Sequence, residues 1–109
     1  MAGYKRITNK DLEQQAELLN YITGNEEQPC HWTPEDGTIW HIGSFYIAGA
    51  YGGYKLLQVT NKGGGCIDAL PTGYTTKKDL YNSMRCFERG LHVVQDKMEE
   101  KLINKQGGQ

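Results

Sequence analysis

The sequence has no long hydrophobic run, and this absence excludes a membrane-spanning helix, which needs about 20 predominantly apolar residues in succession. The stretch from Met1 to Thr8 has a polar start and is not followed by the hydrophobic stretch of a secretory signal. We therefore expect a soluble protein that stays in the cytoplasm and has no membrane partner.

An excess of charge of one sign is also missing. The chain carries 12 basic and 13 acidic residues, which gives a formal net charge of −1 at pH 7. A charge so close to zero produces no general field that would attract nucleic acid or an anionic membrane. A bound anion would therefore have to be held by a local cluster of cations.

Disulfide frameworks and recognisable catalytic or metal motifs are absent as well. Cys30, Cys66 and Cys86 are an odd number of cysteines at wide spacing, which is typical of free thiols in a reducing compartment. His31 and His41 are near Cys30 in the sequence, but no tightly spaced ligand pair anchors a metal site. No spacing matches a nucleophile with its base or a pair of catalytic carboxylates. We expect no metal, no other cofactor and no catalysis.

The length of the chain allows one small domain. With 109 residues and 38% hydrophobic content, the chain can form a core, although a second copy would add useful burial. Past Val94 the last predicted helix is charged on most sides. We expect a single α+β domain over residues 1–95 and a charged helical extension with a flexible tail over residues 96–109.

The clearest local pattern is a hairpin. Phe45–Tyr51 and Tyr54–Asn61 are rich in β-forming residues, and Gly52-Gly53 between them predicts a tight turn, because glycine adopts a positive φ without steric cost. With the two glycines as the loop, Tyr51 lies opposite Tyr54. Apolar residues then occur on both faces of the sheet. We expect helices on one face and a second copy of the chain on the other, in a homodimer or higher homo-oligomer.

The residues around the hairpin predict an α+β fold. A helix over residues 8–23 is indicated by its apolar spacing, by the capping pair Thr8 and Asp11, and by Gly24 at its end. Residues 25–37 have the composition of a loop, and residues 38–42 and 65–70 predict short strands. The expected sheet is an antiparallel meander of about four strands.

A long C-terminal helix completes the predicted fold. Thr76 and Asp79 form a capping pair at its start. The apolar residues that follow recur at intervals of three and four, which is typical of a helix packed on a sheet, here at least as far as Val94. These residues are Leu80, Met84, Phe87, Leu91, Val94, Met98 and Leu102.

Two places in the sequence have the composition of an anion site. The stretch Asn61-Lys62-Gly63-Gly64-Gly65 places unobstructed backbone N–H groups beside a cation, although glycines at a strand connection are also ordinary turn residues. The other place is the predicted start of the C-terminal helix, where the helix dipole favours a phosphate, although such a stripe of cations is often only a solvated face. Its polar residues are Thr75, Thr76, Lys77 and Lys78, with Arg85 and Arg89 further along the same side.

Aromatic rings accompany these cations. Tyr46, Tyr51 and Tyr54 lie on or beside the hairpin, and a base that stacks on such a ring gains about 1–3 kcal/mol. Most of the tyrosines in the chain are expected to fill the core or an interface. Stacking surfaces together with two phosphate sites favour a nucleotide ligand.

The span from Lys5 to Leu91 has a helix, a Gly-rich meander with AYGGYKLLQVTN and a helix that opens with TTKKDLY. It resembles small accessory proteins of bacteriophages, and it is most similar to the anti-Thoeris sponge proteins, which bind and hide a cyclic ADP-ribose signal. The resemblance implies pockets at a homodimer interface, with an aromatic residue on the adenine, an asparagine at the base edge and cations on the phosphates. Those roles would fall on Tyr51, Asn61 and Lys78, with Lys77 or Arg85 as further phosphate partners.

Two features of this sequence depart from that pattern. The stacking residue would be a tyrosine, and Lys78 would stand where an arginine is expected, which loses a bidentate fork. The expected register also places Tyr51 and Asn61 on opposite faces of the sheet. One pocket would then have to combine residues from two subunits or contain a longer loop.

The sequence therefore predicts a phage-type counter-defence protein that sequesters a nucleotide signal, a cyclic ADP-ribose isomer, without degrading it, in the cytoplasm of the host cell. The expected ligand-binding residues are Tyr51, Asn61, Lys62, Gly63, Gly64, Lys77, Lys78 and Arg85. A double-stranded nucleic-acid-binding module of α-β-β-β-α order is an alternative, although the near-neutral charge disfavours nucleic acid as a partner. A protein inhibitor that covers a host enzyme with its sheet is a further alternative.

Overall fold

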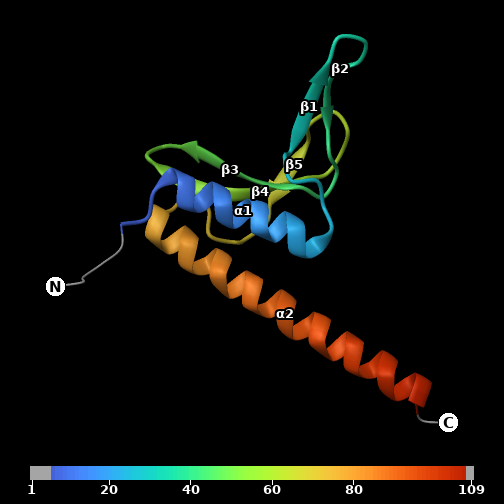
Figure 1. The fold of residues 1–109 in the computed structure, drawn as a ribbon. Helices are drawn as coiled ribbons and strands as arrows, with labels where there is room; N and C mark the ends of the chain where they lie inside the picture. The colour runs from blue at the N-terminus through green and yellow to red at the C-terminus, as the bar shows by residue number, and fades with distance from the viewer. Residues whose placement is uncertain (1–5, 108–109) are drawn as a thin grey trace.

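The computed structural model describes residues 6–107, with side chains as far as Lys101. Two helices enclose five strands in the chain order, which confirms the predicted α+β fold and the long C-terminal helix packed on the sheet (Figure 1). The elements are α1 (Asn9–Thr23), β1 (Cys30–Thr33), β2 (Gly37–Trp40), β3 (Phe45–Ala50), β4 (Gly53–Val59), β5 (Cys66–Asp68) and α2 (Lys77–Gly107).

The ends of α1 are fixed by the predicted residues. The Asp11 N–H donates to Thr8 Oγ1 at 3.2 Å, and the Thr8 N–H donates to Asp11 Oδ2 at 2.9 Å. These two bonds satisfy backbone donors that a helix start otherwise leaves unpaired. Gly24 ends the helix with a φ of 77°, a conformation that glycine adopts without strain.

Both helices pack on the same face of a three-stranded antiparallel sheet of order β3-β4-β5 (Figure 1). Helix α1 contacts β3 and helix α2 contacts β4, so the core forms between the helix pair and the sheet. The rings of Phe45 and Phe87 meet edge to face with centroids 5.7 Å apart. The buried apolar side chains of this core are Leu12, Ala16, Leu19, Phe45, Leu56, Leu80 and Met84.

The hairpin between β3 and β4 forms as predicted, but its turn consists of Tyr51 and Gly52. Their φ angles are 53° and 72°. Ala50, which pairs with Gly53, is the last paired residue before the turn, a position that the prediction gave to Tyr51. The predicted pairing of Tyr51 with Tyr54 is therefore wrong. Because the slip is of two residues, every strand residue stays on its predicted face of the sheet.

The packing of Gly53 explains why this glycine lies in the strand. A Cβ at this position would lie 3.1 Å from the backbone of Tyr74 and Thr75. The segment before α2 therefore passes so close to β4 that it favours glycine there. Tyr51 takes the left-handed position in the turn at a cost of roughly 1 kcal/mol.

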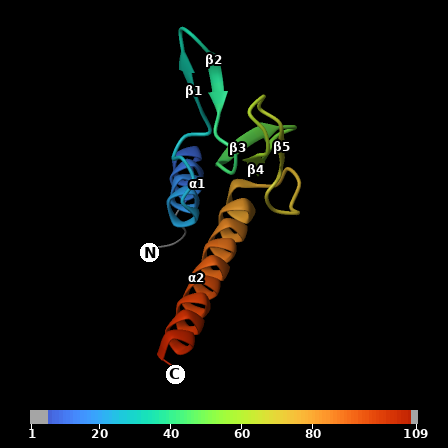
Figure 2. The ribbon, with the colours of Figure 1, turned by 90° about the vertical axis from the view of Figure 1, so that its right-hand side faces the viewer.

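The predicted loop over residues 25–37 contains a strand, β1, so this part of the prediction is wrong. The strand expected over residues 38–42 is β2 (residues 37–40), and it pairs with β1 in a separate two-stranded sheet. The Pro-Glu-Asp sequence serves only as the turn of this hairpin, where the Asp36 N–H donates to Thr33 Oγ1 at 3.1 Å. The β1–β2 hairpin projects from the body of the protein as an arm (Figures 1 and 2).

The outer face of the sheet is partly covered by the chain itself. Trp40 from the arm lies near Tyr46, with ring centroids 6.1 Å apart, and Leu57 and Val59 are already buried. Self-covering reduces the apolar area that a second copy would have to bury. The homodimer stays a prediction.

Asn20 joins α1 to the free edge of β3. Its side chain is fully buried, its Nδ2 donates to the carbonyl oxygens of Phe45 (3.0 Å) and Glu27 (3.1 Å), and its Oδ1 accepts from the Phe45 N–H at 2.6 Å. The carboxamide thus supplies the partners that a neighbouring strand would give to Phe45.

We expect Asn20→Ala to lower the free energy of unfolding by about 2–4 kcal/mol, because the buried N–H and C=O of Phe45 would lose their partners. Gln14→Ala on the exposed side of α1 is the matched control and should change it by less than about 0.5 kcal/mol. Urea denaturation of both variants measures the difference. Equal stability of the two variants would contradict the bridging role of Asn20.

Candidate functional site

A basic hollow opens at the end of the sheet where the β3–β4 turn meets the start of α2. Its volume is about 500 Å³. The side chains of Arg6, Lys77 and Lys78 line it together with Tyr54, and the turn contributes Gly52. Three cations and an aromatic residue from separate parts of the chain therefore border one space, which we call the basic hollow. Ile7 and Thr76 complete the lining.

Backbone pairing brings the two sides of the basic hollow together. The Tyr54 N–H donates to the Thr75 carbonyl at 2.8 Å, and the Thr75 N–H donates to the Tyr54 carbonyl at 2.9 Å. This bridge holds the segment before α2 against β4. The helix therefore begins beside the turn of the hairpin.

The start of α2 adds a favourable electrostatic field. Thr76 Oγ1 accepts from the Asp79 N–H at 3.1 Å, so the threonine caps the helix as predicted. The positive end of the helix dipole lies here and favours an anion. The Lys77 ammonium lies 5.3 Å from the centroid of the Tyr54 ring, where the ring and the cation attract each other.

Tyr51 lies beside this site, in the same turn as Gly52. Its side chain is 93% exposed, and its ring contacts the edge of Tyr74 with centroids 5.4 Å apart. Tyr74 also contacts Lys55, whose ammonium lies 4.3 Å from the Tyr74 ring centroid and 3.0 Å from Asp68 Oδ1. The hydrogen bond with Asp68 is the main reason that the pKa of Lys55 is raised.

The predicted anion nest at residues 61–65 is closed by its own asparagine. Asn61 Oδ1 accepts from the N–H groups of Gly63 (2.9 Å) and Gly65 (3.0 Å), and the Gly64 N–H donates to the Asn61 carbonyl at 3.2 Å. Gly64 has a φ of 95°, and a Cβ there would lie 2.7 Å from the Trp40 indole nitrogen. These groups hold the loop together and fix it against the arm.

The structure does not bring all the predicted ligand residues together within one chain. Lys77 and Lys78 line the basic hollow and Tyr51 is next to it, whereas Asn61, Lys62, Gly63 and Gly64 follow the other end of β4. The length of that strand separates Tyr54 from Asn61 by roughly 20 Å.

Arg85 lies farther along α2, about two turns beyond Lys78. Its guanidinium donates to the Tyr81 hydroxyl at 3.3 Å and lies 3.5 Å from Glu88 Oε1. The Tyr81 hydrogen bond is the first cause of its raised pKa, followed by the nearby charges. Arg6 takes part in the hollow instead, and no sequence pattern indicated it, because it precedes α1 and meets α2 only in the folded chain.

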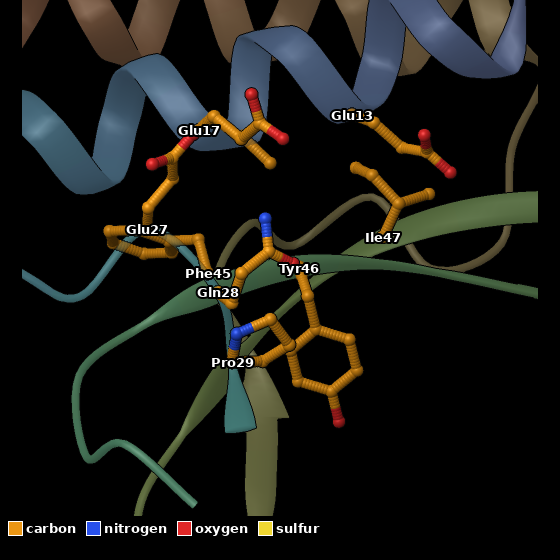
Figure 3. Close-up of a pocket in the computed structure, with 9 residues that line it drawn as sticks. Glu13, Glu17, Glu27, Gln28, Pro29, Phe45, Tyr46 and Ile47 are labelled. Carbon is orange, nitrogen blue, oxygen red and sulfur yellow. The ribbon is translucent and has the colours of Figure 1, made fainter. Parts of the chain in front are cut away.

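A second hollow, of about 320 Å³, lies between α1 and β3 (Figure 3). Glu13, Glu17 and Glu27 line its upper side, and Phe45 and Ile47 lie across from them (Figure 3). Three carboxylates repel a phosphate, so this hollow does not suit the predicted nucleotide.

Within residues 6–101, no three histidine, cysteine, aspartate or glutamate side chains are grouped so that they can hold a metal ion. No helix in the described part of the chain has the length and apolarity needed to cross a membrane. Comparison with protein-family models, curated proteins and solved structures found no significant match.

Among the tyrosines of residues 6–101, Tyr46 is the one whose ionisation is most affected by the fold. Burial, and next its hydrogen bond with Cys66, raise its pKa from 10.0 to about 12. The neutral phenol therefore stabilises the folded protein below pH 10, and this contribution is lost as the pH rises from about 10 to 12.

We expect Tyr46→Phe to remove the last phenol to ionise in an ultraviolet absorbance titration of the folded protein at alkaline pH. Tyr21→Phe, which changes an exposed ring on α1, is the control and should leave that last step in place. An unchanged final step in Tyr46→Phe would show that another tyrosine has the raised pKa.

We also expect Asn61→Ala to lower the free energy of unfolding by about 1–2 kcal/mol, because two backbone donors lose their acceptor. Asn61→Asp keeps an acceptor oxygen and should restore most of the loss. Lys62→Ala in the same loop serves as the control for thermal or urea unfolding. If all three variants unfold like the parent, the side chain of Asn61 does not hold the loop.

Proposed function

We propose that the protein binds a phosphate-bearing nucleotide in the basic hollow and sequesters it without chemical change. The observation that carries the proposal is the convergence of Arg6, Lys77 and Lys78 on one hollow that Tyr54 also lines, at the start of a helix. Cations and a helix dipole bind phosphate, and an aromatic ring binds a base.

The size of the basic hollow supports a small-molecule ligand. Its volume of about 500 Å³ lies in the range of pockets that hold compact organic ligands, which run from about 300 to 1,000 Å³. A duplex nucleic acid would need a longer basic surface. In a chain with a formal net charge of −1, we expect basic surface only in local clusters. A nucleotide therefore fits this site better than a duplex does.

The conformation of Tyr51 supports a binding role beside the basic hollow. A bulky residue with a φ of 53° is strained, and at 93% exposure the ring gains little burial in return. Such strain is often kept at ligand sites. Tyr51 and Tyr74 provide an exposed aromatic pair on which a base can stack next to the cations.

The chemistry of the lining supports binding without hydrolysis. Its side chains are three cations, a phenol, a threonine hydroxyl and an isoleucine. These groups stabilise negative charge, but none of them is a carboxylate or histidine that would act as a general base at neutral pH. A ligand held here should be recovered intact.

Within this proposal, the preferred ligand is a cyclic ADP-ribose isomer, as the resemblance to anti-Thoeris sponge proteins implies. The protein would then counter a host defence by lowering the free concentration of the signal. The homodimer that the resemblance implies is part of this proposal, whereas Asn61 and its neighbours hold their own loop and do not line the basic hollow.

We expect Lys78→Ala to weaken binding of cyclic ADP-ribose about tenfold, which corresponds to about 1.4 kcal/mol, because one phosphate contact is lost near the helix end. Lys77→Ala should have a similar effect and also change the environment of Tyr54. Lys62→Ala, which removes the same charge at the far end of β4, is the matched control and should bind like the parent in calorimetry.

The contrary outcomes separate the alternatives. Equal binding by all three lysine variants would place the ligand elsewhere on the protein. If no nucleotide binds, and duplex RNA binds with an affinity that falls steeply with salt, the nucleic-acid-binding function replaces the proposed one.

A further inference from the structure

Two histidines meet at the base of the β1–β2 arm. His31 Nδ1 lies 2.7 Å from His41 Nε2, and the ring centroids are 4.8 Å apart. The His41 N–H donates to the Pro29 carbonyl at 2.8 Å, which continues the antiparallel pairing of the arm beyond Trp40. This pairing places the two imidazoles on the same face of the ribbon.

The hydrogen bonds determine which nitrogen of His41 carries a proton. His41 Nδ1 lies 2.7 Å from the Gln28 carbonyl oxygen, and a carbonyl can only accept a hydrogen bond. The proton of neutral His41 is therefore on Nδ1, and its Nε2 offers a lone pair toward His31. A backbone carbonyl that fixes one ring nitrogen in this way is a typical outer partner of a metal-ligating histidine.

The distance between the facing nitrogens is close to what a metal chelate requires. With metal–nitrogen bonds of about 2.0–2.1 Å, two ligands at a right angle are about 2.9 Å apart, and two at a tetrahedral angle are about 3.3 Å apart. The observed 2.7 Å is shorter by only a few tenths of an ångström. His31 is exposed and can turn by that amount, while its proton moves to Nε2.

The surrounding charge favours a cation. Residues 25–43 contain four carboxylates and neither lysine nor arginine. These acidic residues are Glu26, Glu27, Glu35 and Asp36. This negative segment contrasts with the basic hollow, so the two sites differ in the ligands that they attract.

We propose that His31 and His41 form a binding site for a divalent transition-metal ion of the Ni²⁺ or Zn²⁺ class. Imidazole is a preferred ligand of these ions. Because residues 6–101 supply no third protein ligand nearby, water completes the coordination and the ion remains exchangeable. The bound ion links β1 to the residue that follows β2 and so fixes the base of the arm.

Calorimetric titration of the full, tag-free chain with NiCl₂, followed by ZnCl₂, tests the proposal. We expect one saturable site per chain and at least tenfold weaker binding in His31→Gln and in His41→Gln. His92→Gln is the matched control. His92 lies 3.5 Å from Glu88 on α2, and this histidine–carboxylate pair is an alternative place for a metal ion to bind. This control should bind like the parent.

A measurement on the parent protein tests the proposal without depending on whether the variants fold. Zn²⁺ should protect His31 and His41, but not His92, from acylation by diethyl pyrocarbonate, as read by mass spectrometry. Equal modification of all three histidines in Zn²⁺ would overturn the proposal. Loss of binding in His92→Gln, or in Cys30→Ser with both arm histidines present, would also overturn it by placing the ion elsewhere.

Discussion

The reciprocal backbone hydrogen bonds between Tyr54 and Thr75 are the constraint on which the site depends. They tie the segment before α2 to β4 and fix the point at which the helix begins. Gly53 permits this contact, because a side chain there would meet the backbone of the same segment at 3.1 Å. The tight approach moves the turn onto Tyr51 and Gly52, and it brings the lysines of the helix start to the aromatic residue of the strand.

The small net charge hides a separation of charge along the molecule. Arg6, Lys77 and Lys78 gather at one end of the sheet, whereas the arm and the residues on either side of it contribute four carboxylates and neither lysine nor arginine. The net charge of the chain therefore does not indicate which ligands bind, whereas the local arrangement of charged residues does. The basic end suits a phosphate and the acidic arm suits a cation.

Much of the fold could be predicted because its signals are local. Thr8 with Asp11 marks one helix start, and the glycine pair marks the hairpin. The turn itself was misplaced by one residue because two neighbouring glycines satisfy the local rule equally well, and only the packing of Gly53 against a distant segment selects between the possibilities. The same holds for the site: the lysines of the helix start could be found in the sequence, but Arg6 could not. Asn61 was a plausible ligand residue until its side chain proved to close its own loop.

The central claim is that the basic hollow is the ligand site, and an amide NMR titration with cyclic ADP-ribose tests it most directly. The account predicts saturable shifts at Gly52, Gly53 and Tyr54 in the hairpin and at Lys77 and Lys78 in the helix, with the amides of residues 63–65 unchanged. Shifts confined to residues 61–65, or no shifts at millimolar ligand, would contradict it.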